Sequence, residues 1–183
     1  MISPAGHTVG TADAVRDEAM RLYDVTGNVT AFEPYLTKND LKDDSGQLPD
    51  AATLRQFQET TYTAMNQAAT QMINSDFYAG LSDGEKETVL GELYTAIKSV
   101  EKANILGKDK DNLNGAAKAY NTSGADGLLE YLTASSILRQ TGMANNEKNR
   151  EHVLETLNNG GADAVQAMYD QSQELADAGF DSN

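Results

Sequence analysis

The fold is decided by two neighbouring stretches, AATLRQFQETTYTAMNQAATQMIN at residues 51–74 and LSDGEKETVLGELYTAIKSVEKANILG at residues 81–107. Apolar residues recur in both at spacings of three and four, the period of a helix with one buried side. In the first stretch these positions are Leu54, Phe57, Met65, Ala68, Met72 and Ile73, with Thr61 filling a gap. In the second stretch they are Val89, Leu93, Ile97 and Val100. The sequence therefore predicts two long helices.

Capping residues mark the ends of these two helices. Asp50 is suited to cap the start of the first helix, because its carboxylate can accept a free backbone N–H. Ser82 and Glu85 form a capping box at the start of the second helix, and Gly107 ends it. Since the connection between the helices is short, we expect them to pack antiparallel as a hairpin.

Shorter helices are expected on both sides of the hairpin. Before it, Val15, Ala19 and Leu22 form one stripe in a helix over residues 11–25 that ends at Gly27. The stretch 30–50 is polar and contains prolines, which predicts a loop with at most a short helix at 37–41. After the hairpin, helices are predicted over residues 113–120, 125–140, 147–158 and 163–178.

No run of alternating apolar and polar residues indicates a strand. The predicted fold class is therefore all-α, an irregular bundle of about six helices around a central long antiparallel hairpin. We divide it into an N-terminal helix and loop (1–50), the hairpin (51–107) and an acidic region of short helices (108–183). Together the three regions are expected to form one compact domain.

Composition excludes several classes of function. The 183 residues include 28 acidic and 14 basic ones, so the net charge is −14. This excess of acidic residues excludes non-specific binding to nucleic acid and attachment to anionic membranes, because both need clustered Lys and Arg. Because Cys is absent, disulfides, thiolate nucleophiles and zinc–thiolate sites are excluded. We expect no cofactor, no direct binding of nucleic acid and no membrane partner.

No phosphate-binding, nucleophile-elbow or zinc-protease motif occurs in the chain. His152 stands beside Glu151 and three residues before Glu155, which leaves two interpretations, a fragment of a metal site or a surface histidine among solubilising acids. We predict no catalytic and no metal-binding residues, and hence a non-enzymatic protein. The N-terminus has no signal peptide pattern, so we expect a cytoplasmic location.

Negative charge is concentrated at the C-terminal end. No Lys or Arg follows Arg150. The candidate partner-binding residues are the acids that recur there on helical faces, namely Glu147, Glu151, Glu155, Asp163, Asp170, Glu174 and Asp177. Such rows keep a protein dispersed, and they also imitate the phosphates of a nucleic-acid strand. Both interpretations stay open at this point.

The hairpin residues are similar to a known phage module. The segments LRQFQETTY (54–62), MINSDFY (72–78), LSDGEK (81–86) and LYTA (93–96) resemble a helical hairpin in large virion-associated or morphogenesis proteins. Those proteins belong to phages and prophages of Gram-positive gut bacteria, so the resemblance implies the cytoplasm of a bacterial host cell. The resemblance covers about 50 residues and implies fold and provenance, with no catalytic residues to transfer.

Members of that family are usually segments of much larger chains, whereas this chain begins with Met1 and has 183 residues. It is therefore expected to be either a fragment or a small accessory protein of a mobile element. Small acidic phage proteins include the anti-CRISPR inhibitors, so by analogy we expect a host partner with a basic nucleic-acid cleft, such as an RNA-guided nuclease with its guide RNA. The alternative is a structural or interaction module of a phage virion or morphogenesis protein. A homodimer is compatible with either.

Overall fold

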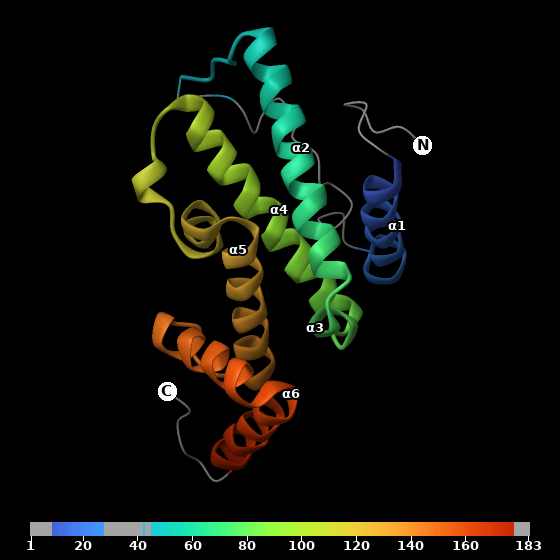
Figure 1. Ribbon diagram of the computed structural model, residues 1–183, viewed down its shortest axis with the longest axis vertical. Coiled ribbons are helices and arrows are strands. Elements are labelled where there is room, and N and C mark those ends of the chain that lie inside the picture. Colours follow the sequence, from blue (N-terminus) through green and yellow to red (C-terminus); the bar gives the residue numbers. More distant parts are fainter. Residues whose placement is uncertain (1–8, 28–41, 43–44, 178–183) are drawn as a thin grey trace. The chain divides into compact units, whose positions relative to one another are not determined.

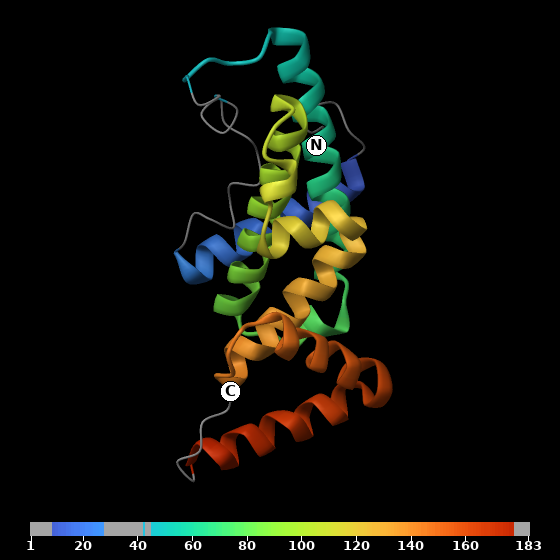
Figure 2. The same ribbon diagram turned by 90° about the vertical axis from the view of Figure 1, so that its left-hand side faces the viewer.

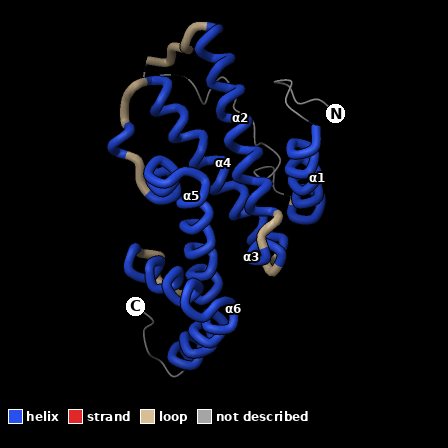
Figure 3. Tube along the Cα trace, in the orientation of Figure 1, coloured by secondary structure: helices blue, strands red, loops and turns tan. Residues whose placement is uncertain are grey.

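The computed structural model describes residues 9–27, 42 and 45–177. Its helices are α1 (Val9–Thr26), α2 (Ala51–Ile73), α3 (Asp76–Ala79), α4 (Asp83–Leu106), the short 3-10 helix η3 (Lys110–Asn112), α5 (Gly115–Thr141) and α6 (Glu147–Asp177) (Figure 1). The described residues contain helices and loops but no strand (Figure 3), which confirms the all-α fold class. In the same residues, no helix is both long and apolar enough to cross a membrane. The short helix predicted at 37–41 lies outside the described residues.

The long hairpin predicted from the sequence is formed by α2 and α4, which run antiparallel side by side (Figures 1 and 2). Asp50 caps α2, because its Oδ1 accepts a hydrogen bond from the backbone N–H of Thr53 at 2.8 Å. Ser82 caps α4, its Oγ accepting from the N–H of Glu85 at 3.2 Å. Gly107 ends α4 with a φ of 66°, a left-handed conformation that glycine adopts without steric cost.

The chain divides into two compact units, Met1–Leu129 and Glu130–Asn183. In the first unit α1 packs against both α2 and α4. The core between these three helices consists of fully buried apolar side chains: Val15, Ala19, Leu22, Phe57, Met65, Ala68, Met72, Val89, Leu93, Ile97 and Val100. The predicted stripes are therefore confirmed except at Leu54 and Ile73, which are only half-buried because they lie in the first and last turns of α2.

Two glycines interrupt α5 and α6 in the same way. Gly124 has φ 66° and ψ −153°, and Gly161 has φ 67° and ψ −160°, so each leaves the helical region for a single residue. This conformation is essentially restricted to glycine. In both places the next residues are Ala and Asp. The direction of the chain changes sharply between the two segments of α6 (Figure 2).

The second unit contains buried apolar side chains and a cation stacked on an aromatic ring. Leu132, Leu138 and Val153 are fully buried. The guanidinium of Arg150 lies over the ring of Tyr131, 4.6 Å from its centroid. This contact joins the start of α6 to α5 across the turn at residues 142–146.

Candidate functional site

Three of the predicted partner-binding residues lie on the first segment of α6. Asn146 directly precedes this segment, and its Oδ1 accepts a hydrogen bond from the N–H of Asn149 at 2.8 Å. Glu147, Glu151 and Glu155 follow at intervals of four residues, so they lie on one helical face about 6 Å apart. All three side chains are exposed. We call these three residues the acidic row.

The acidic row has no partner among the residues that the structure describes: none of its carboxylates forms an ion pair or hydrogen bond there. Two basic residues, Lys148 and Arg150, stand on the same segment. Arg150 is occupied, since it covers the Tyr131 ring and donates to Asn145 Oδ1 at 2.7 Å. The carboxylates of the row therefore face solvent.

The other predicted acids are on the second segment of α6. Asp163 and Asp170 are exposed there. The side chains of Glu174 and Asp177 lie outside the described part of the structure. Because Gly161 breaks the helix, the predicted acids are divided between two helical segments.

Tyr131 and Tyr169 are tyrosines of the C-terminal part of the chain. Tyr131 is half-buried and Arg150 covers one face of its ring. It therefore stabilises the second unit instead of offering a free ring. The Tyr169 side chain lies outside the described residues.

His152 is exposed. Across the described parts of the chain, no group of three or more His, Asp or Glu side chains is placed to hold a metal ion.

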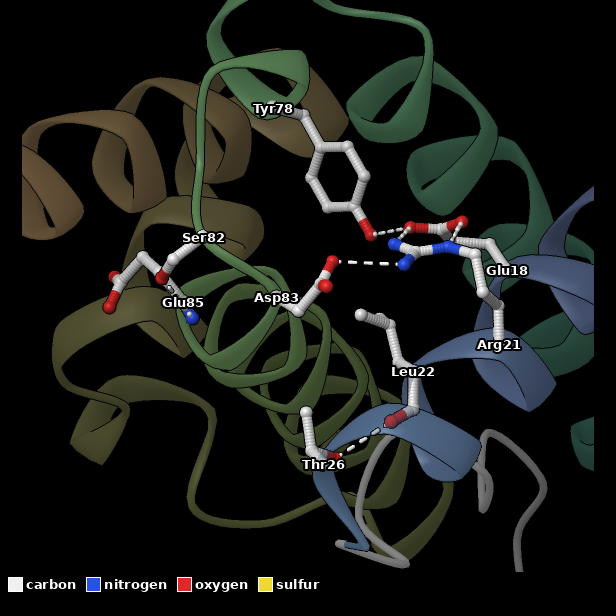
Figure 4. A network of polar contacts seen from close by, with 8 residues as sticks. All are labelled: Glu18, Arg21, Leu22, Thr26, Tyr78, Ser82, Asp83 and Glu85. Carbon is white, nitrogen blue, oxygen red and sulfur yellow. Dashed lines mark hydrogen bonds and ion pairs between the residues drawn. The ribbon is translucent and has the colours of Figure 1, made fainter.

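A second polar site lies in the first unit and was not predicted from the sequence (Figure 4). It joins Glu18 and Arg21 of α1 to Tyr78 of α3 and Asp83 of α4. The Tyr78 hydroxyl donates to Glu18 Oε1 at 2.6 Å, and Arg21 donates to both oxygens of Glu18 at 2.8 and 3.0 Å. Arg21 also donates to Asp83 Oδ1 at 2.9 Å. We call these four residues the α1 network.

Glu18 and Tyr78 of the α1 network have shifted pKa values. Partial burial acts to raise the pKa of Glu18, but the hydrogen bonds from Arg21 and Tyr78 outweigh it and hold that pKa below its ordinary value of 4.5. Burial and the bond to Glu18 raise the pKa of the Tyr78 hydroxyl. Glu18 is therefore ionised and Tyr78 neutral at pH 7.

An open groove of about 490 Å³ lies beside the α1 network, and Asp17 and Lys86 are among the residues that line it. Lys86 stands over the Tyr78 ring, 5.2 Å from its centroid. Both acidic and basic side chains line the groove. The Glu18 carboxylate already accepts hydrogen bonds from three donor groups. The geometry thus suits holding α1 against α3 and α4 better than binding an ion.

Sequence reasoning missed the α1 network because its members are far apart along the chain. Only the pair Glu18 and Arg21, three residues apart on one helix, gives a local signal of opposite charges. Tyr78 and Asp83 follow 60 and 62 residues after their partners.

Comparison with known proteins found that no family model, no curated protein and no solved structure matches this chain.

Proposed function

We propose that the protein binds a partner protein with a basic surface through the acidic row of α6, and that it thereby blocks the partner's access to nucleic acid. The observation that carries the proposal is the set of three exposed carboxylates at one pitch on a segment after which no Lys or Arg follows. Unlike Glu18, these carboxylates are not used within the described structure.

The regular row of negative charges on α6 favours a partner protein that normally binds the phosphate backbone of a nucleic acid. The row presents one negative charge about every 6 Å along α6. A nucleic-acid strand likewise presents negative charges in a regular row, the phosphates. A basic cleft attracts such a surface over a distance of about the Debye length, roughly 8 Å at physiological salt. Binding of this kind is fast and weakens as salt rises.

For the partner we propose an RNA-guided nuclease with its guide RNA, which makes the protein an anti-CRISPR-like inhibitor. Such nucleases hold nucleic acid in a positively charged channel, which fits the sign of the acidic row. The choice among basic partners rests on the resemblance of the hairpin to phage proteins. The charges of α6 support only the broader statement that the partner is basic.

A capture experiment with two matched triple variants tests the proposal. The protein is immobilised, exposed to a lysate that contains CRISPR nucleases, and eluted along a salt gradient. We expect wild type to recover a nuclease with its guide RNA that releases at moderate salt. The variant Glu147→Lys, Glu151→Lys, Glu155→Lys should recover none, because it repels a basic cleft.

The control is the variant Glu59→Lys, Asp111→Lys, Glu130→Lys, which reverses three exposed acids outside α6 and changes the net charge equally. It should recover the nuclease as wild type does. Equal loss in both variants would mean that only total charge matters. Full recovery by the α6 variant would contradict the proposal.

A structural module of a phage virion or morphogenesis protein is the second candidate. The observation in its favour is on α1, where Met20 and Tyr23, three residues apart, are 38% and 41% exposed. Apolar side chains at this spacing form a small patch suited to self-association. This candidate predicts oligomers that persist at high salt, whereas a complex made through the acidic row dissociates. Sedimentation at low and high salt separates the two.

A further inference from the structure

A second feature of α6 adjoins the acidic row. An open groove of about 390 Å³ is lined by His152, Glu155, Thr156, Asn159, Gly160 and Ala164. The first five residues precede the break at Gly161 and Ala164 follows it, so the two segments of α6 form the two sides of the groove. We call it the α6 groove.

The backbone around the break forms this groove. Gly161 takes a φ of 67°, which turns the second segment away from the helical direction. Gly160 allows the two sides to approach closely, because a Cβ at this position would lie 2.4 Å from the Cβ of Ala164. The two glycines therefore produce a concave site at the end of the acidic row.

The residues that line the α6 groove offer hydrogen-bond acceptors. Glu155 supplies a carboxylate that belongs to both the row and the groove. Asn159 supplies an amide oxygen, and the Thr156 hydroxyl, which already donates to the His152 carbonyl at 2.8 Å, keeps lone pairs free to accept. The imidazole of His152 adds a flat ring. Among the residues that the structure describes, no Lys or Arg lines the groove.

We infer that the α6 groove holds an arginine side chain of the basic partner while the acidic row holds the charges around it. A guanidinium is planar, carries five N–H donors and stacks on flat rings, so it can use a carboxylate, an amide oxygen and an imidazole together. A lysine ammonium is a compact charge that gains less from such a set. This inference rests on the proposed function, since it names the side chain through which that partner is recognised.

The test uses two fluorescent probes of equal length and charge, an arginine homopeptide and a lysine homopeptide, titrated with the full-length protein at low salt. We expect wild type to bind the arginine peptide about fivefold more tightly, the effect of roughly one additional hydrogen bond. The groove variant Thr156→Val, Asn159→Leu removes acceptors without changing charge. It should bind both peptides with similar affinity.

The matched variant Glu147→Gln, Glu151→Gln removes charge from the acidic row and leaves the groove residues in place. It should weaken both peptides equally and keep the preference for arginine. His152→Ala, which removes only the flat ring, is measured as a second groove variant. Circular dichroism is used to check that each variant is folded. A preference for arginine that is reduced in both groove variants supports the inference.

Two results would overturn the inference, and they have different consequences for the proposed function. If wild type binds the two peptides equally and the row variant weakens both, the acidic row is a binding surface but the groove does not select arginine. If wild type binds neither peptide, or the row variant binds both as wild type does, the proposed function fails as well.

Discussion

Two glutamates of the first unit have pKa values shifted in opposite directions. Burial raises the pKa of Glu101, and a hydrogen bond with the Asn104 side chain only partly opposes this. Glu18 is also partly buried, but Arg21 and Tyr78 supply donors that lower its pKa. The environment thus decides which carboxylate stabilises the fold in its ionised form. At pH 7 the ionised Glu18 contributes stability, whereas ionisation of Glu101 costs stability.

The variant Glu18→Gln should lower the free energy of unfolding by about 1 kcal/mol at pH 7, because it removes a charged acceptor at a partly exposed site. The contribution of Glu18 is complete above its unfolded pKa of 4.5 and is lost as the pH falls through the lower folded value. The difference between variant and wild type should therefore shrink in acid. Urea unfolding at about pH 7 and about pH 3 measures it.

Glu59→Gln is the control for this comparison, since Glu59 is an exposed glutamate on α2. Its unfolding should match that of wild type at both pH values. A Glu18→Gln variant as stable as wild type at pH 7 would show that the α1 network does not stabilise the unit. An equal loss at both pH values would show that charge is not the cause.

At the scale of helices, the sequence is most informative where the signals are local. The caps of α2 and α4 depend on side chains three residues from their backbone partners, so Asp50 and Ser82 could be identified directly. The buried stripes were predictable for the same reason, because a helix repeats its buried face every three to four residues. Tyr62 and Ala69 were missed, although both are buried on α2.

The breaks in α5 and α6 were predicted only roughly. Sequence patterns placed a loop between helices at 113–120 and 125–140, but in the structure only Gly124 leaves the helical conformation. The predicted helices 147–158 and 163–178 did leave a gap around Gly160 and Gly161, where α6 breaks. What the sequence could not reveal is that one residue makes each break and that Gly160 is needed for close approach to Ala164.

Substitution of Gly160 by Ala should lower the free energy of unfolding by about 1–3 kcal/mol, because the new Cβ would overlap the Cβ of Ala164. Ala164→Gly alone should cost about 1 kcal/mol from helix propensity. The double variant should cost less than the sum of the two single variants, since removing the Ala164 methyl removes the overlap. Thermal unfolding of all four proteins measures this cycle.

Strictly additive effects would contradict this explanation of Gly160. In that case the absence of a side chain at Gly160, next to the Ala164 methyl group, would not contribute to stability. Gly142 has a positive φ of 71°, unlike Gly160, and a Cβ there would meet no atom within 4 Å, so its substitution serves as a comparison without overlap. Gly142→Ala should lose stability from backbone strain alone, and Ala164→Gly should not relieve it.

For the whole molecule, the distribution of charge could be obtained from the sequence and the arrangement of the first unit could not. The absence of Lys and Arg after Arg150 is visible in the chain itself. In contrast, Tyr78 reaches Glu18 only because α1 packs on α4 and α3 follows α2 closely. Contacts between residues 60 apart depend on helix packing, for which a single sequence has no direct signal.

The acidic row indicates that the proposed partner carries positive charge, but it does not identify that partner. Its three carboxylates can be satisfied by any surface with Lys and Arg at a similar spacing. The arginine site that we infer in the α6 groove would restrict the choice to partners with an accessible arginine. A competition experiment is therefore needed to connect the row to nucleic-acid access.

The most direct test of the central claim measures how much DNA an RNA-guided nuclease binds, with its guide RNA loaded, as the protein is added. Wild type should reduce DNA binding in a dose-dependent way, less strongly as salt rises, and the variant Glu147→Lys, Glu151→Lys, Glu155→Lys should leave DNA binding unchanged. Unchanged DNA binding at saturating wild-type protein, or equal inhibition by the variant, would contradict the claim that the acidic row of α6 occupies a nucleic-acid cleft.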